Sequence, residues 1–210
     1  MSIFAFRHRV YRKFELAAFN AKIFYLKRKN VRIEVGADLS LFGSPQFQVK
    51  PDTEVRIGAN CILRSKRNSN PIGVDHPVTF CTLQSQAKIV IGNSVGISGG
   101  TICARQLIEI GANTLIGANA YIFDNDFHPI DSVARAKNDE SATRCAPVSI
   151  GSNVFIGARS IVLKGVTIGD NTVIGAGSVV SKSIPPNVIA SGNPCRVIRV
   201  LDPKMTVAVE

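Results

Sequence analysis

An aliphatic residue recurs every six positions through much of this chain, and no other feature limits the possible folds as strongly. A six-residue period is neither the 3.6-residue period of a helix nor the two-residue alternation of a half-exposed strand. It indicates a chain that winds through flat faces, with each aliphatic side chain stacked on its equivalent in the next coil. The clearest block makes five consecutive steps of six, at Ile150, Ile156, Val162, Ile168, Ile174 and Val180.

The rest of the repeat follows the same rule less regularly. A second block covers residues 91–122, and weaker copies begin at Val35 and Ile57. Glycine usually follows the aliphatic residue and Asn or Asp comes soon after it, and these residue types tolerate the backbone angles of tight corners. We therefore predict a mainly β fold, a parallel β-helix, over residues 33–185.

Two segments break the period. Residues 64–79 and residues 127–147 are polar, and insertions into a solenoid leave the stack as loops that often carry function. The Ile-Pro-Pro sequence at residues 184–186 is expected to stop the winding. Residues 186–210 then form a C-terminal tail.

The first 32 residues have a different character. Residues 3–29 are predicted to form a helix, because their apolar residues recur at steps of three and four. Residues 1–32 hold nine Lys or Arg and one acidic residue, Glu15, and so carry +8 of the formal net charge of +10. One apolar stripe comprises Val10, Phe14, Ala17, Ala21 and Phe24, and a second comprises Leu16, Phe19, Ile23 and Leu26.

A helix that is apolar on so much of its circumference should be covered. We expect this basic arm either to pack on the body or a neighbouring subunit, or to dock on an anionic membrane surface. The remainder of the chain is nearly neutral, so its charge does not indicate nucleic-acid binding.

The cysteines and the hydropathy pattern bear on the compartment. Five cysteines, an odd number without a C-x-x-C spacing, argue against a disulfide framework or a zinc ribbon and favour reduced thiols. No apolar run approaches the roughly 20 residues of a membrane span, and basic residues at positions 7–13 interrupt any signal-peptide core. We therefore expect a cytoplasmic protein. Peripheral binding of the basic arm to the inner face of the cell membrane remains an alternative.

His128 is the strongest candidate for catalysis. It stands where the second repeat block runs into the larger insertion, within Asp124-Asn125-Asp126-Phe127-His128-Pro129-Ile130-Asp131. Imidazole is the side chain best suited to accept a proton from an alcohol near neutral pH. Neighbouring carboxylates, Asp126 among them, are near enough in sequence to orient its other nitrogen.

Residues 91–200 resemble the hexapeptide-repeat acetyltransferases, especially the galactoside and maltose acetyltransferases and the polysaccharide O-acetyltransferases. The resemblance rests on the His-Pro at residues 128–129, on the sequences Pro-Val-Ser-Ile-Gly-Ser-Asn-Val-Phe-Ile-Gly-Ala at 147–158 and Ser-Gly-Asn-Pro-Cys-Arg-Val-Ile-Arg at 191–199, and on the repeats between them. It implies a homotrimer of left-handed β-helices with active sites between subunits. It also implies that His128 deprotonates an acceptor hydroxyl, which then attacks acetyl-CoA directly.

The resemblance also assigns the contacts with acetyl-CoA. It implies that small residues leave room for the pantetheine arm and that basic residues oppose the phosphates, for which Arg provides directional hydrogen bonds. The residues so assigned are Ala158, Ala176, Ser181, Lys182, Arg196 and Arg199. A backbone amide near Gly157 or Ala158 is a candidate for stabilising the oxyanion.

The sequence departs from the family at the acceptor side. Phe155 stands where the family often has Trp, and Ser98 and Thr101 occupy the stretch where sugar acetyltransferases use a polar side chain, often Asn. His76, in the smaller insertion, is interpreted as part of a turn, with a place in the acceptor cleft as the alternative. A carbohydrate hydroxyl of a surface polysaccharide or its precursor is the expected acceptor.

Other functions remain as alternatives. The alternative acceptor is an antibiotic or another xenobiotic. The alternative to an enzyme is a non-enzymatic, membrane-associated scaffold. A β-helical carbonic anhydrase needs three histidine ligands on zinc, whereas this chain has only three histidines and one of them, His8, lies in the arm. We therefore expect no metal.

Overall fold

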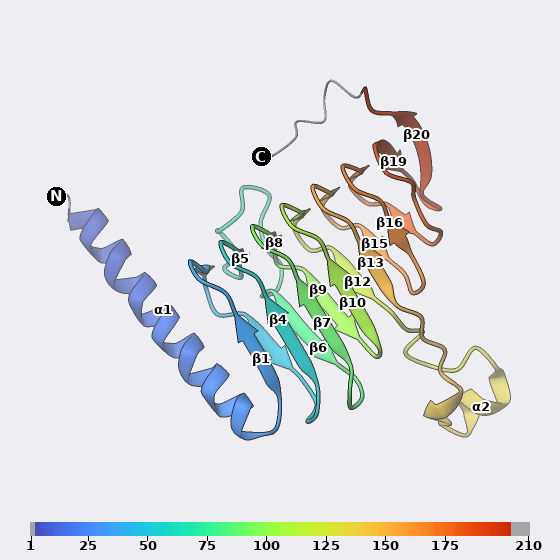
Figure 1. Cartoon of the computed structure of the whole chain (residues 1–210), viewed down its shortest axis with the longest axis horizontal. Helices are drawn as coiled ribbons and strands as arrows, with labels where there is room; N and C mark the ends of the chain where they lie inside the picture. Colours follow the sequence, from blue (N-terminus) through green and yellow to red (C-terminus); the bar gives the residue numbers. More distant parts are fainter. Residues whose placement is uncertain (1–2, 203–210) are drawn as a thin grey trace.

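A computed structural model describes residues 3–202, with side chains from Glu15 onward. The chain forms the predicted left-handed parallel β-helix, with helix α1 (Ile3–Arg28) lying along one end of the stack (Figure 1). Each coil contributes one strand to each of three sheets, and the sheets form the three faces of the β-helix. Neighbouring strands pair in parallel throughout, except for the last pair.

The strands distribute over the three faces as follows. Sheet A comprises β1 (Arg32–Val35), β4 (Glu54–Ile57), β7 (Lys88–Ile91), β10 (Leu107–Ile110), β13 (Val148–Ile150) and β16 (Thr167–Ile168). Sheet B comprises β2 (Ser40–Phe42), β5 (Ile62–Arg64), β8 (Gly96–Ser98), β11 (Leu115–Ile116), β14 (Phe155–Ile156), β17 (Val173–Ile174), β19 (Val188–Ser191) and β20 (Arg196–Val200). Sheet C comprises β3 (Gln46–Gln48), β6 (Thr79–Thr82), β9 (Thr101–Ala104), β12 (Tyr121–Phe123), β15 (Ile161–Val162) and β18 (Val179–Val180).

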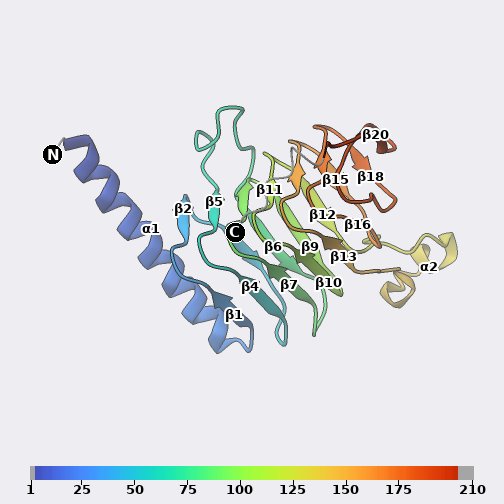
Figure 2. The same ribbon diagram turned by 45° about the horizontal axis from the view of Figure 1, so that its top comes forward.

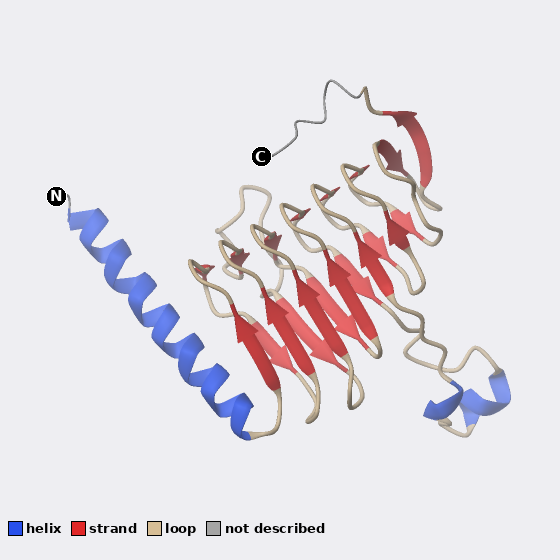
Figure 3. Cartoon of the chain, in the orientation of Figure 1, coloured by secondary structure: helices blue, strands red, loops and turns tan. Residues whose placement is uncertain are grey.

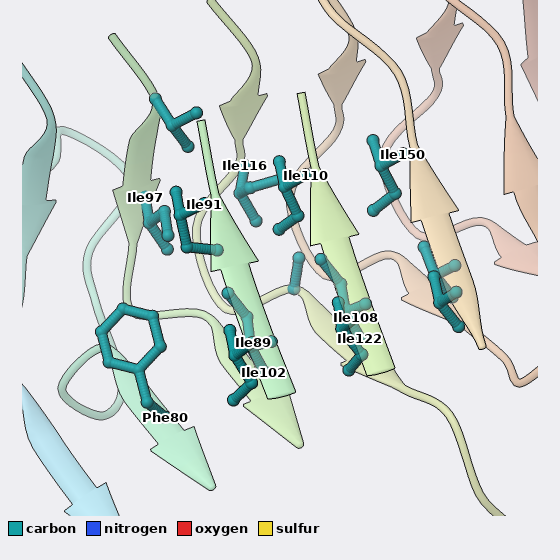
Figure 4. Close-up of a cluster of buried hydrophobic side chains, with 14 of the residues drawn as sticks. Phe80, Ile89, Ile91, Ile97, Ile102, Ile108, Ile110, Ile116, Ile122 and Ile150 are labelled. Atoms are coloured by element: carbon teal, nitrogen blue, oxygen red, sulfur yellow. The ribbon is translucent and has the colours of Figure 1, made fainter. Parts of the chain in front are cut away.

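The six-residue period becomes columns of stacked side chains in the core. In sheet A, Ile91 pairs in register with Ile110, Ile110 with Ile150, and Ile150 with Ile168. These side chains are at most 2% exposed, and Figure 4 shows labelled isoleucines from all three faces converging on the interior. Because each aliphatic residue meets the same residue type one coil on, the interior excludes water along its length.

The corners confirm the role predicted for glycine and asparagine. Asn113, Asn119 and Asn153 adopt positive φ angles of 57°, 61° and 56°, a left-handed conformation that Asn tolerates better than most residues. Gly111 is required for a second reason: a Cβ there would lie 2.5 Å from backbone atoms of the next coil.

Helix α1 closes the N-terminal end of the stack. Phe19, Ile23 and Leu26, from the second predicted stripe, are buried against the β1 and β2 end of the core. The helix runs beside β1 at this end of the stack in both views of the ribbon (Figure 2). The described part of the first stripe is exposed, with Phe24 61% accessible. The arm therefore packs on the body through one stripe only. Leu16, also from the second stripe, is 42% exposed. Val10 and Phe14 lie outside the described side chains, as do the basic residues at positions 7–13.

The winding continues one step further than the sequence predicts. Ile184 makes a parallel bridge with Ile168, β19 pairs in parallel with β17, and β20 then turns back antiparallel on β19. Pro185 and Pro186 lie at a corner between these pairings, where no ladder hydrogen bond needs their missing N–H groups. The two prolines therefore do not stop the coil.

Two loops leave the stack where the period breaks (Figure 3). The segment around residues 64–79 joins β5 to β6, between sheets B and C. Residues 127–147 join β12 to β13, between sheets C and A, and contain α2 (Ser132–Ala136) and the short 3₁₀ helix η1 (Glu140–Ala142). Both insertions thus leave the coil at corners, and they do so on different edges of the three-sided β-helix.

Candidate active site

His128 stands at the base of the larger loop. Asn125 and Cys145 form an antiparallel bridge there, Asp126 N donates to Arg144 O at 3.0 Å, and Ala146 N donates to Asp124 O at 2.9 Å. This short ladder clamps the two ends of the loop together, and α2 stands away from the body beyond it (Figure 1). The side chain of His128 is exposed.

Three polar neighbours of His128 have structural partners. Asp124 is fully buried and accepts hydrogen bonds at 2.6–2.8 Å from the backbone amides of residues 105–107. Asn125 donates to Asp124 and accepts from Phe127 N at 2.8 Å, and Asp131 caps α2 by accepting from Ala134 N. These side chains shape the backbone that presents His128, and none of them bonds its ring.

Asp126 pairs with a lysine that the sequence analysis missed. Its Oδ1 accepts from Lys164 Nζ at 2.6 Å, and the two side chains are only 20% and 29% exposed. Its backbone oxygen accepts from His128 N at 2.6 Å. Its Oδ2 is buried without a hydrogen-bond partner among the described residues. One carboxylate oxygen of Asp126 therefore bonds Lys164, and the other has no hydrogen-bond partner among the described residues. No described residue hydrogen-bonds the His128 ring.

A ladder of thiols and an aromatic ring lies on sheet C beside this loop. Cys81, Cys103 and Phe123 are in register on adjacent strands, and the Phe127 ring packs edge-on against Phe123 with centroids 5.2 Å apart. A hydrogen bond between the two thiols lowers the pKa of Cys81 and raises that of Cys103, whose pKa burial raises further. None of the five cysteines forms a disulfide bond.

The proposed acetyl-CoA contacts Ala158 and Ala176 lie on the edge between sheets B and C, in consecutive coils. A Cβ on Gly157 would lie 2.4 Å from Ala176 N, and Gly177 N donates to Ala158 O at 2.8 Å. Within the described residues, the backbone amides of Ala158 and Ala176 donate no hydrogen bond. Two strong donors therefore remain available at this edge.

At the comparable edge between sheets A and B, side chains cap two of the amides that follow a corner glycine. There Asn93 Oδ1 accepts from Ala59 N at 2.9 Å, and Asp170 Oδ1 accepts from Ser152 N at 2.7 Å. Side chains thus satisfy two amides that hold the same position after the corner glycine. Among the described residues, the amides of Ala158 and Ala176 have no such cap, and neither do those of Ala112 and Asp170 between sheets A and B.

The smaller loop ends beside these donors. Asp75 N donates to Asn119 Oδ1 at 2.9 Å, and the Asp75 carboxylate pairs with Arg159, the residue after Ala158, at 3.0 Å. The His76 ring packs on Tyr121 with centroids 5.6 Å apart, and its Nε2 is buried without a described partner. His76 is therefore a partly buried residue at the edge of the Ala158 corner.

The remaining proposed contacts lie elsewhere. Ser181 and Lys182 are exposed after β18, on the edge between sheets C and A that also carries His128. Arg196 and Arg199 are exposed on β20, in sheet B. Because the width of sheet C separates the edge of His128 from the edge of Ala158, one chain does not bring the predicted base and the predicted acetyl-CoA wall together.

Comparison with known proteins identifies the type of repeat. A family model described as the hexapeptide repeat of succinyl-transferase matches residues 108–122 and 147–182. The galactoside O-acetyltransferase of Escherichia coli (strain K12) is 47% identical over 102 residues, 49% of this chain and 48% of that protein. The resemblance to the hexapeptide-repeat acetyltransferases is confirmed. The chain spans about half the length of the curated relatives that it matches.

Other acetyltransferases extend the comparison. A putative acetyltransferase of Saccharomyces cerevisiae is 48% identical over 119 residues, 54% of this chain and 59% of that protein. The solved structure of a galactoside acetyltransferase in complex with coenzyme A is 27% identical, with a TM-score of 0.52, and the match covers 97% of this chain and 86% of that one. The β-helix architecture is therefore shared over nearly the whole chain.

Two further observations concern the part of the chain that the structure describes. No cluster of three or more His, Cys, Asp or Glu side chains is arranged to hold a metal ion there. None of its helices combines the length and the apolar character needed to cross a membrane.

Proposed function

We propose that this protein is an acetyl-CoA-dependent O-acetyltransferase that acts on a sugar hydroxyl of a surface polysaccharide or its precursor. The observation that carries the proposal is the pair of uncapped amides at Ala158 and Ala176, stacked in consecutive coils on an accessible edge. The solved galactoside acetyltransferase described above holds coenzyme A. Its likeness to this chain supports the same class of ligand here.

The edge between sheets B and C suits the pantetheine arm. The carbonyl oxygens of the pantetheine arm need donors along a flat wall, which the backbone amides of Ala158 and Ala176 supply. A Cβ on Gly177 would meet no atom within 4 Å, so the surface beside them is open. In the proposal, Arg196 and Arg199 bind the phosphates. Ser181 and Lys182 lie on the other edge of sheet C, together with His128, and reach the nucleotide end from the neighbouring subunit.

His128 is the proposed general base. It accepts the proton of the acceptor hydroxyl, whose oxygen attacks the thioester carbonyl and forms a C–O bond. A backbone amide of the Ala158 corner stabilises the oxyanion. As the C–S bond breaks, the protonated imidazole returns the proton to the departing thiolate, so that the products are the acetyl ester and free CoA.

A homotrimer accounts for the separation of the two edges. His128 projects from the edge between sheets C and A, while Ala158 lies between sheets B and C. When three copies pack around an axis, the His128 edge of one copy can face the Ala158 edge of the next, which gives three equivalent sites. We propose this arrangement, in which each site draws its base and its acetyl-CoA wall from different subunits.

Asp126 is proposed to position the base. One of its oxygens is held by Lys164, which fixes the carboxylate, and the other has no described partner. That free oxygen is available to accept from the His128 ring when the acceptor is bound. A carboxylate in this role sets the tautomer of the imidazole and stabilises its protonated form.

The test compares wild type, His128→Ala and Lys137→Ala, which changes an exposed residue of the same loop. Release of free thiol from acetyl-CoA is measured with a panel of sugars and glycans, and CoA affinity is measured separately. We expect His128→Ala to lower kcat by at least about 100-fold without changing CoA affinity, and Lys137→Ala to behave as wild type. A wild-type protein that neither binds CoA nor releases thiol contradicts the proposal.

The arm is proposed to hold the enzyme at the inner face of the cell membrane. Phe24 and Tyr25 are 61% and 55% exposed, and Arg28 and Lys29 lie over their rings at 4.9 and 4.8 Å. Aromatic rings flanked by cations suit an anionic lipid surface. We expect flotation with anionic but not with zwitterionic vesicles, and its loss in Phe24→Ser/Tyr25→Ser. Equal flotation of wild type and variant contradicts this role.

A further inference from the structure

A cavity of about 240 Å³ lies on the outer face of sheet B, next to the smaller loop. Its apolar wall is formed by Ile62, Leu115 and Phe155, which are 37%, 53% and 46% exposed. Gly96 leaves the hollow open, since a Cβ there would approach only the end of the Leu115 side chain, at 3.0 Å. Flat apolar surfaces of this kind pack well against the C–H face of a sugar ring.

The polar side of the cavity comes from the smaller loop and from β8. Asn70 Nδ2 donates to Ser98 Oγ at 3.1 Å, and the Ser98 side chain is buried, with the residue only 8% exposed. Arg64 Nη1 donates to Ser69 O at 2.9 Å, and its guanidinium lies 4.5 Å from the centroid of the Phe42 ring. Both contacts hold the guanidinium of Arg64 in place at the cavity.

Arg64 carries a positive charge that no described carboxylate neutralises. None of the residues lining the cavity is acidic. Asp75, in the same loop, is paired with Arg159 instead. Arg64 is only half-exposed and uses one of its N–H donors on Ser69, and a guanidinium has five. A fixed, partly desolvated guanidinium with spare donors is suited to a carboxylate or a phosphate.

The cavity adjoins the proposed acetyl-CoA wall. Gly117 lines it, and a Cβ on Gly117 would lie 2.6 Å from Ala158 N in the next coil. A molecule seated on Phe155 and Leu115 is therefore next to the amide donors of that corner. The cavity is somewhat smaller than the roughly 300 Å³ of complete ligand sites, as expected if a second copy supplies the rest of the cleft.

We propose that this cavity is the acceptor subsite and that it selects a saccharide bearing an anionic group. The sugar ring lies on Phe155 and Leu115, Asn70 and Ser98 bind its hydroxyls, and Arg64 binds its carboxylate or phosphate. The inference rests on the proposed function, because it names the acceptor class of that reaction. Asn70 then supplies a side-chain amide beside Ser98, which itself has only a hydroxyl group.

The experiment measures saturation-transfer NMR binding and acetyl transfer with matched sugars. Glucose and galactose are compared with glucuronate and galacturonate, and with glucose 6-phosphate, so that the carboxylate and phosphate arms are separate. The variants are Arg64→Gln, Gly96→Val, which fills the hollow, and Arg67→Gln as a matched control. Arg67 is an exposed cation of the same loop that does not line the cavity.

We expect wild type and Arg67→Gln to bind at least one anionic sugar about tenfold more tightly than its neutral counterpart. Arg64→Gln should abolish that preference while leaving neutral sugars and CoA affinity unchanged, and Gly96→Val should weaken both kinds of sugar. Equal binding of neutral and anionic sugars by wild type, or equal loss in Arg64→Gln and Arg67→Gln, overturns the inference. CoA binding and thiol release are measured in the same experiments. If the wild-type protein shows neither, the proposed acetyltransferase function fails, and this result is distinct from the outcomes that overturn the acceptor subsite.

Discussion

The replacement Gly111→Ala tests how tightly the corners of consecutive coils are packed. An added Cβ would lie 2.5 Å from both Gly151 C and Ser152 N and 2.7 Å from Gly151 O. All three are backbone atoms, which cannot rotate away as a side chain would. The overlap is nearly 1 Å against an ordinary contact of about 3.4 Å, so the next coil must move.

The cost of that movement follows from the hydrogen bonds on either side. Gly111 N donates to Ile150 O at 2.7 Å, and Asn153 N donates to Ala112 O at 2.8 Å. Weakening both costs about 1 kcal/mol each, and strain in a packed interior adds about 1–3 kcal/mol. We expect a loss of about 3–5 kcal/mol in the free energy of unfolding, which corresponds to a fall in Tm of roughly 10 °C for a chain of this size.

Urea and thermal unfolding followed by circular dichroism measure this loss. The matched control is Gly96→Ala, where the new Cβ meets only the flexible end of Leu115 at 3.0 Å. We expect the control to stay within about 1 kcal/mol of wild type, because Ala also reduces the entropy of the unfolded chain. If Gly111→Ala is as stable as Gly96→Ala, the corners are not close-packed and the steric reasoning is wrong.

Three further predictions concern the surroundings of His128. Asp124→Ala leaves three backbone amides without their acceptor, so we expect a loss of about 3 kcal/mol, seen as a lower urea midpoint; an unchanged midpoint contradicts the capping role. Lys164→Met removes the counter-charge of Asp126, and we expect kcat to fall about tenfold or more with CoA affinity unchanged; wild-type kcat would show that the ion pair does not position the base. Cys81 should react with iodoacetamide at lower pH than an ordinary thiol, because the hydrogen bond from Cys103 lowers its pKa and the thiolate is the reactive form. Peptide mapping by mass spectrometry checks this, and modification of Cys103 first would refute it.

The sequence carries enough information to place residues of uninterrupted coils relative to one another. Ile150 and Ile168 pair in register, so one coil takes 18 residues. Ala158 and Ala176 are 18 apart, as are Lys164 and Lys182, and counting alone puts each pair on one edge. The same count separates the Ala158 edge from the Lys182 edge.

Counting fails wherever an insertion interrupts the coil. Ile62 pairs with Gly96 across the smaller loop, a separation of 34 instead of 18 residues. The partnership of Asn70 with Ser98 therefore leaves no periodic signal. The ion pair between Asp126 and Lys164 spans the larger loop and is hidden in the same way.

By itself, the sequence determined the coil, because an aliphatic residue every sixth position can be buried only if successive turns stack. It also determined the corners, since Gly and Asn are the residues that accept their backbone angles. The tertiary structure alone decided which edge each loop leaves, that Asp126 binds Lys164, and that Arg64 is held without a counter-charge. These depend on contacts between segments whose spacing the insertions set, and side-chain pairing across such distances is fixed by packing rather than by period.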